Sequence, residues 1–398
     1  MFDDAGVVAV LEAFDQSDSF KDYVKIPDFN EPLYSSSSLV EQVANLVRGS
    51  STLKELNLSK KALYPTGAAT IISALAESPS LENFDQLPPM DAHLYESEEV
   101  QEEIKKVIAC SKRLKRVDLT ERKLNEEQVV SFLNSILESS ILESLEQLPS
   151  VDDDLCAKPE IHELLLKIIS NSKSLKSLNC YNKSMTVEKV CEMLTALCDS
   201  ESIKSLECLP VLEVELYSNA EVLPLLTKIH DEGKLMTKGN FGAMKLSASE
   251  TLDLLNFINT FGSFAERLEE LYMGDFTLNC TDLTGEGACD LVDSILQKAV
   301  DLKSLMLPGV GTYKDMFFED GGCRVLAHSD KSREFLKYLS NTSHLIKKLP
   351  SFSGGQKFGE NDDESFQLII ECLKKSESLK ELFCLRQELT SAQTTEVF

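Results

Sequence analysis

The sequence is short of basic residues, with 40 Lys and Arg against 66 Asp and Glu in 398 residues. Its formal net charge of −26 would repel phosphate groups, so we expect no nucleic-acid partner and regard a basic protein as the natural complement. No apolar run reaches the roughly 18 residues that a membrane-spanning helix needs. The acidic start MFDD is also unlike a secretory signal. We therefore expect a cytoplasmic chain without membrane contact.

Motifs that carry chemistry are missing as well. The 11 cysteines form no CxxC pair and no Cys/His cluster at zinc spacing, which predicts reduced thiols and no metal. The 5 histidines do not pair as in HExxH, and GxSxG does not occur. The stretches GGQKFG and GVGTYK lack the residue order of a phosphate-binding loop. We expect neither an enzyme nor a cofactor.

What the sequence does contain is a repeat of 61 residues, which splits into steps of 33 and 28. Segments of the form LxxLxL begin at Leu53, Leu114 and Leu175. Segments of the form LxxLxxLP begin at Phe20, Leu81, Leu142 and Ile203. The pattern continues less regularly from Leu235, Leu268, Leu302, Ser343 and Leu379. Together these starts predict twelve strand-like units.

Between the units lie helical patterns, with apolar residues at i, i+4, i+7 and i+8. The sets are Leu39, Val43, Leu46, Val47; Val100, Ile104, Val107, Ile108; Val129, Leu133, Ile136, Leu137; and Ile161, Leu165, Ile168, Ile169. A short strand and one amphipathic helix cannot bury their apolar sides alone, so the copies are expected to stack. The pattern predicts an α/β solenoid, with parallel strands on the concave face and helices on the convex face.

The run LKELNLSKKALYPTGAATIISALAESPS from Leu53 to Ser80 resembles the 28-residue leucine-rich repeat of the ribonuclease-inhibitor type. The resemblance covers essentially the whole chain and implies a horseshoe of about twelve repeats. The sequence departs from the family at the ninth repeat position, where the family has Asn or Cys. Here Lys61, Arg122, Lys183 and Gln387 occupy it, so we expect a different turn geometry there.

The resemblance also implies functions seen in that group of proteins. These are inhibition of a basic enzyme, ligand sensing in NOD-like immune receptors, and activation of a small nuclear-transport GTPase. We expect a protein-interaction module that binds a basic protein on its concave face, as the ligand-sensing region of a larger receptor or as an inhibitor. A GTPase-activating or other regulatory scaffold protein is the alternative.

The period also predicts the domain organisation. We expect a single solenoid over residues 1–398, with regular 61-residue double repeats in 5–235 and irregular repeats with inserted loops in 236–398. A shift of 61 aligns Ala5-Gly6-Val7 with Thr66-Gly67-Ala68, and Phe398 follows the last strand-like unit before any helix. The chain is therefore expected to begin and end within a repeat.

Candidate partner-binding residues come from the fifth position of the units, which should lie between the inward-facing leucines on the concave face. They are Asn57, Asp85, Asp118, Glu146, Asn179, Glu207, Tyr272, Met306 and Phe383. Acidic and amide groups come first along the chain, and aromatic and apolar groups follow. A solvated face without a partner stays open as an alternative, because a slip of one residue in the LxxLxxLP units would reverse every side chain.

An insertion after Leu302 lengthens one step to 41 residues and contains PGVGTYKDMFFEDGGCRVLAHSD. We expect a binding loop with an apolar tip of Tyr313, Met316, Phe317 and Phe318, or a tolerated insertion whose aromatic residues tuck back onto the repeats.

The second position of the units alternates in charge. It runs Lys54, Glu82, Lys115, Glu143 and Lys176. Neighbouring parallel strands lie about 4.8 Å apart, so this alternation predicts a ladder of ion pairs that helps to set the register.

Overall fold

The structure is a computed structural model. It describes residues 4–16, 25, 26, 34, 36–181, 185–241, 244 and 246–272, and short segments at 294–295, 297–298, 304–306, 316–319, 322–325, 351–353, 370–371, 374–375 and 381–383. The chain divides into two compact units, residues 1–206 and residues 207–398.

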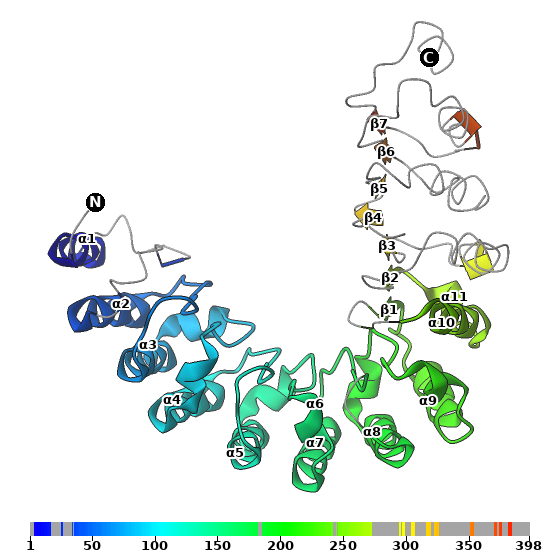
Figure 1. Cartoon of the computed structure of the whole chain (residues 1–398), viewed down its shortest axis with the longest axis horizontal. Coiled ribbons are helices and arrows are strands. Elements are labelled where there is room, and N and C mark those ends of the chain that lie inside the picture. Colours follow the sequence, from blue (N-terminus) through cyan, green and yellow to red (C-terminus); the bar gives the residue numbers. More distant parts are fainter. Residues whose placement is uncertain are drawn as a thin grey trace, which may run out of the picture. The chain divides into compact units, whose positions relative to one another are not determined.

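Unit 1 is built from helices that succeed one another along the chain. The α-helices are α1 (Asp4–Gln16), α2 (Ser37–Gly49), α3 (Pro65–Glu77), α4 (Glu98–Cys110), α5 (Glu126–Leu137), α6 (Asp153–Cys156), α7 (Pro159–Asn171) and α8 (Val187–Asp199). The 3-10 helices are η3 (Pro79–Asn83), η4 (Ala92–Glu96), η5 (Ser140–Glu143) and η6 (Glu201–Lys204). Apart from the single-turn helix α6, each α-helix packs against the next, as Figure 1 shows for α2 to α8.

The predicted apolar stripes are the buried faces of α2, α4, α5 and α7. Of the sixteen residues in those four sets, Leu137 alone is half-buried and the others are buried. The helix starts follow local chemistry. Pro65 and Pro159 stand in the first turns of α3 and α7, where a missing N–H costs nothing, and Asn125 forms a capping box with Gln128 at α5.

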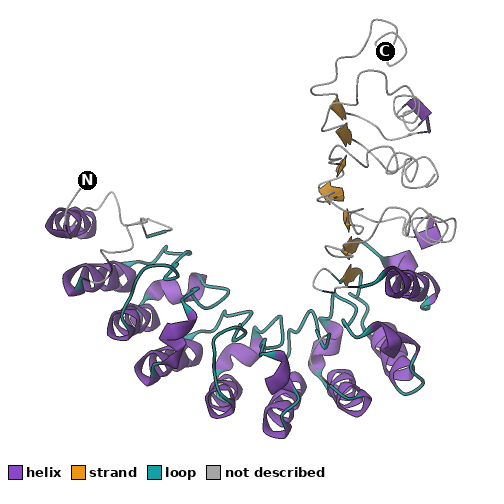
Figure 2. Ribbon diagram, viewed as in Figure 1, coloured by secondary structure: helices purple, strands orange, loops and turns teal. Residues whose placement is uncertain are grey.

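The segments between the helices of unit 1 meet through single parallel bridges. These join Lys25 to Glu55, Gln86 to Arg116, Asp118 to Ser150, and Gln147 to Ser177. Figure 2 shows these connecting segments gathered on one side of the helices of unit 1, which we call the strand side. The predicted alternation of helices and parallel strand-like segments is confirmed for the described part of unit 1.

A serine stands three residues before the first leucine or isoleucine of each described unit from Leu53 to Ile203. These serines are Ser50, Ser78, Ser111, Ser139, Ser172 and Ser200. The Ser50 carbonyl accepts hydrogen bonds from Ser78 Oγ (3.0 Å) and Ser80 Oγ (2.7 Å) of the next unit. The Ser172 carbonyl accepts the equivalent bonds from Ser200 Oγ (3.0 Å) and Ser202 Oγ (2.8 Å). Buried hydroxyls thus connect the two units of each of these 28-residue steps. Ser139 Oγ and Ser172 Oγ donate instead to the carbonyls of Ile136 and Ile168 in the helices that precede them.

Unit 2 contains η7 (Val214–Ser218), α9 (Val222–Glu232), α10 (Ala248–Thr260) and α11 (Phe264–Arg267). Its strands β1 (Lys238–Asn240), β2 (Glu270–Tyr272) and β3 (Ser304–Met306) form a parallel sheet in chain order. A second parallel pair joins β6 (Ser351–Ser353) to β7 (Glu381–Phe383). Stacked aromatic rings fill the described core: Tyr217 lies 4.6 Å from Phe257, and Phe257 lies 4.6 Å from Phe261, between ring centroids.

The insertion after Leu302 contains more regular structure than predicted. Strands β4 (Met316–Glu319) and β5 (Gly322–Val325) pair antiparallel, with Phe317 opposite Arg324. Met316, Phe317 and Phe318 therefore belong to a β-hairpin strand and not to an open loop. Phe317 and Phe318 are aromatic residues, a class enriched in strands. Tyr313 lies outside the described residues.

We predict that the serine bonds between units stabilise unit 1 cooperatively. Ser80→Ala should cost about 1 kcal/mol, because Ser78 Oγ still reaches the Ser50 carbonyl. The double change Ser78→Ala/Ser80→Ala removes both side-chain donors and should cost about 2–3 kcal/mol. Hydrogen exchange of the segment 50–58 measures the loss. Ser73→Ala, on α3, is the matched control, and equal exchange in all three variants would contradict the prediction.

We predict acid-sensitive stability in unit 2 from His230 of α9. Burial lowers the pKa of His230 and outweighs the raising effect of the hydrogen bond to Asp231. The unfolded chain therefore binds the proton more readily, and stability is lost as pH falls from the unfolded pKa of about 6.5 toward the lower folded value. His230→Gln should flatten this dependence in urea unfolding at pH 7.5 and 5.0. His93→Gln, which changes an exposed histidine, should leave it in place.

Candidate functional site

Each LxxLxxLP unit of unit 1 pairs with the LxxLxL unit that follows it with a shift of three residues. Gln86, at the sixth position of an LxxLxxLP unit, bridges Arg116 at the third position of the next LxxLxL unit, and Gln147 bridges Ser177 in the same way. The motif LxxLxxLP contains the LxxL spacing twice, and its second copy is the one that aligns. Leu81, Leu142 and Ile203 of the first copy lie in the 3-10 helices instead. Fifth positions of neighbouring units are therefore not opposite one another in unit 1, and the partner-binding role of the polar fifth-position residues stays a prediction.

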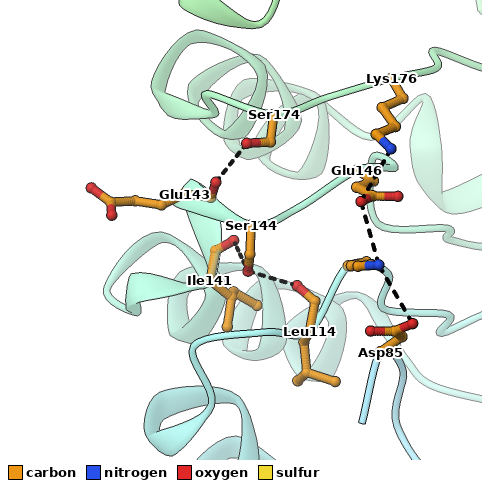
Figure 3. A network of polar contacts seen from close by, with 9 residues as sticks. Asp85, Leu114, Ile141, Glu143, Ser144, Glu146, Ser174 and Lys176 are labelled. Atoms are coloured by element: carbon orange, nitrogen blue, oxygen red, sulfur yellow. Dashed lines mark hydrogen bonds and ion pairs between the residues drawn. The ribbon is translucent and has the colours of Figure 1, made fainter. Parts of the chain in front are cut away.

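A ladder of alternating charge runs along the strand side of unit 1, with different members from those predicted. Lys115 Nζ lies 3.5 Å from Asp85 and 3.6 Å from Glu146, and Lys176 Nζ lies 3.3 Å from Glu146 (Figure 3). The lysines are at second positions as expected. Because of the three-residue shift, the acids come from fifth positions. Glu143, which was expected in this ladder, pairs with Lys173 at 2.7 Å.

Unit 2 contains a ladder of the same kind. Lys238 Nζ lies 3.2 Å from Glu207 and 3.1 Å from Glu270. Burial would lower the pKa of Lys238, but the bonds to these two carboxylates outweigh it and raise the pKa. Asp85, Glu146 and Glu207 are thus acids that already have lysine partners, which weakens the argument that they attract a basic protein.

The other three polar candidates, Asn57, Asp118 and Asn179, accept hydrogen bonds that stabilise turns of the backbone. Asn57 Oδ1 accepts from the backbone N–H of Ser59 (2.9 Å), and Asn179 Oδ1 accepts from that of Tyr181 (3.0 Å). Asp118 Oδ1 accepts from the N–H (3.0 Å) and the hydroxyl (2.6 Å) of Thr120. These are Asx turns, in which a short side chain replaces a backbone acceptor. All three side chains are exposed, but each has a local structural role.

The ninth-position cations explain the departure from the Asn or Cys pattern. Arg122 Nη1 donates to the Met90 carbonyl (3.1 Å), and its guanidinium lies 5.0 Å from the ring centre of Tyr95. Lys61 Nζ lies 5.4 Å from the ring centre of Tyr34. Tyr34 and Tyr95 are themselves 61 residues apart, so the cation–ring contact repeats with the period. Lys183 and Gln387 lie outside the described residues.

The residues on either side of Lys61 and Arg122 have left-handed backbone conformations. Lys60 and Glu121 have φ of 57° and 58°, and Ala62 and Lys123 have φ of 49° and 55°. The Lys60 N–H donates to both carboxylate oxygens of Asp91 (3.0 Å each), and the Glu121 N–H donates to Asp152 (2.8 Å). A carboxylate of the next unit thus stabilises a backbone conformation that L-residues rarely adopt.

Three exposed side chains on the strand side, none of them a fifth-position candidate, form no hydrogen bond or ion pair with a described residue. Gln86, Arg116 and Gln147 are exposed on the strand side, and the structure gives their side chains no hydrogen bond or ion pair with any described residue. Gln147 lies in the strand-like segment next to Arg116, because its N–H donates to the Lys115 carbonyl (3.2 Å). We call these three residues the Gln–Arg–Gln row. Gln86 and Gln147 are at sixth positions and Arg116 is at a third position, so none of the three was among the fifth-position candidates.

The apolar candidates fall in unit 2. Tyr272, Met306 and Phe383 are the last residues of β2, β3 and β7, and Tyr272 is paired with Met306 in register. Their side chains lie outside the described part of the structure, as do those of Met316, Phe317 and Phe318. The partner-binding role of these six residues stays a prediction.

Among the described residues, no group of three or more His, Cys, Asp or Glu side chains is arranged to hold a metal ion. No described helix has the length and apolarity needed to cross a membrane.

We predict that Asp118 acts on stability through its turn. Asp118→Ala should cost about 1 kcal/mol, because Thr120 loses its acceptor. Asp118→Asn should restore nearly all of the loss, since Asn57 and Asn179 make the same turn in the neighbouring LxxLxL units. Urea unfolding monitored by circular dichroism measures the difference. A similar loss with Asn would show that the charge matters and the turn does not.

A comparison of the chain with protein-family models finds no match, and a comparison with curated proteins finds none either. Among solved structures, the crystal structure of the leucine-rich repeat-containing protein LegL7 from Legionella pneumophila is similar at a TM-score of 0.44 and 16% sequence identity. The likeness covers 88% of this chain and 97% of that one. At this level it carries no argument about function. The repeated α/β architecture described above rests on this chain's own buried leucines, stacked helices and parallel bridges.

Proposed function

We propose that this protein is a non-catalytic interaction module that binds a protein partner on the strand side of unit 1. The observation that carries the proposal is the Gln–Arg–Gln row of Gln86, Arg116 and Gln147. Next to the row, Lys115 forms ion pairs with both Asp85 and Glu146. The row itself is exposed and unengaged among the described residues.

The chemistry of the row suits a polypeptide. A side-chain amide both donates and accepts, so it can bond to a peptide N–H and C=O, and a guanidinium offers a fixed fork to a carbonyl or carboxylate. Arginine is enriched among the residues that contribute most to protein interfaces. The three side chains come from neighbouring segments of a stacked repeat. The bridge between Gln86 and Arg116 and the bonds of the Glu146 and Gln147 N–H groups to the Lys115 carbonyl join the backbone of these segments. A preorganised contact surface of this kind costs less entropy on binding.

The ribonuclease-inhibitor type of repeat is also part of the proposal. Its support is the 28-residue step from Leu53 to Leu81, which contains one bridged segment and the 13-residue helix α3. The basic character of the partner is a weaker part, since Asp85, Glu146 and Glu207 are paired with lysines. What supports it is the net charge of −26, which acts as a long-range steering field.

A photo-crosslinking amino acid at Gln147 tests the proposal in cells that express the full chain. We expect a discrete crosslinked protein from position 147 and none from Asn134, an exposed residue on α5. In the purified complex, Arg116→Ala should weaken affinity about 10-fold, or about 1.4 kcal/mol. Equal crosslinking from both positions, or an unchanged affinity, would contradict a binding role for this row.

A further inference from the structure

Unit 1 has a pocket of about 510 Å³ at one end of the Gln–Arg–Gln row. Gln86 and Arg116 line it together with Lys54, Leu56, Phe84 and Leu87. The volume lies within the range of about 300–1,000 Å³ that is typical of ligand sites. The pocket and the row therefore share two side chains and form one continuous surface.

The charges around the pocket are not equally available. The two acids in its lining already have partners: Glu55 lies 3.7 Å from Lys25, and Asp85 lies 3.5 Å from Lys115. Lys54 and Arg116 are exposed, and neither has an ion pair or side-chain hydrogen bond with another described residue. The charge left for a ligand is therefore positive, although the chain as a whole carries −26.

Part of the pocket wall is apolar and rigid. Leu56, Phe84 and Leu87 are 4%, 5% and 9% exposed, so they belong to the packed core and present only their edges. Asn83, which also lines the pocket, is fixed by hydrogen bonds from its amide to the carbonyls of Ser51 (3.0 Å) and Leu53 (3.2 Å). The wall is thus preformed, and an apolar group placed against it needs no rearrangement.

We propose that this pocket binds an acidic peptide segment of the partner. A carboxylate of the segment pairs with Arg116 and Lys54, and a neighbouring apolar side chain packs against Leu56, Phe84 and Leu87. Gln86, which is bridged to Arg116 and also lines the pocket, bonds to the peptide backbone. The inference rests on the proposed function, because it names the class of segment that the strand side recognises. The proposed contact in the pocket is with a negatively charged segment, whereas the net charge of −26 attracts positively charged molecules over longer distances.

Fluorescein-labelled hexapeptides with two glutamates beside phenylalanine or leucine test the proposal by anisotropy with the full chain at 150 mM salt. Long-range repulsion is screened there beyond about 8 Å. We expect saturable binding that falls at least about 10-fold with Arg116→Glu or Lys54→Glu. Lys112→Glu makes the same change in net charge at an exposed lysine outside the pocket lining, and should change affinity less than about 2-fold. Circular dichroism checks that each variant is folded.

Three outcomes would overturn the inference. They are binding of the glutamine or lysine versions of the peptides as strongly as the glutamate version, an equal loss with Lys112→Glu, and no binding of any peptide. Gln147 does not line the pocket, so crosslinking from position 147 tests the proposed function separately. A crosslink without acidic-peptide binding would remove the pocket proposal alone. Peptide binding without a crosslink would remove the Gln–Arg–Gln row from the proposed function.

Discussion

The fold of unit 1 depends on how buried backbone groups are satisfied where each helix gives way to the next strand-like segment. The bridges there are single, so extended sheet ladders cannot supply the partners. Serine hydroxyls do so instead: the Leu53 N–H donates to Ser50 Oγ and Ser80 Oγ, and the Leu175 N–H donates to Ser202 Oγ. An unpaired buried N–H or C=O costs about 1–3 kcal/mol, so each junction without its serine would weaken the stack.

This constraint affects the strand side as well. Serine bonds join the two units of a 28-residue step, and the parallel bridges hold the segments that follow in one register. That register brings lysines of second positions to acids of fifth positions. Each such exposed pair contributes only about 0.2–1 kcal/mol, so the ladder selects the register more than it stabilises the fold. The ladder also decides which charges are engaged and leaves the Gln–Arg–Gln row available.

Much of the architecture followed from the sequence. The 61-residue period, the helical stripes such as that of α4, and the parallel pairing of the strand-like segments are visible in the pattern of apolar residues alone. The candidate site was harder to predict. Asn57, Asp118 and Asn179 were chosen as partner-binding residues because they are polar and between leucines, but a turn needs an acceptor at the same place. Residue type does not distinguish the two roles.

The sequence by itself determined the repeat and the alternation of amphipathic helices with strand-like segments, because burial of one face per element needs only periodic apolar residues. It did not determine the 3-10 helices that contain Leu81, Leu142 and Ile203. The tertiary structure decided the register. The motif LxxLxxLP contains its leucine spacing twice, so two alignments bury leucines equally well, and only contacts between units separate them. In the observed register, Asp85 and Glu146 form ion pairs with lysines, and Gln86, Arg116 and Gln147 are exposed to solvent.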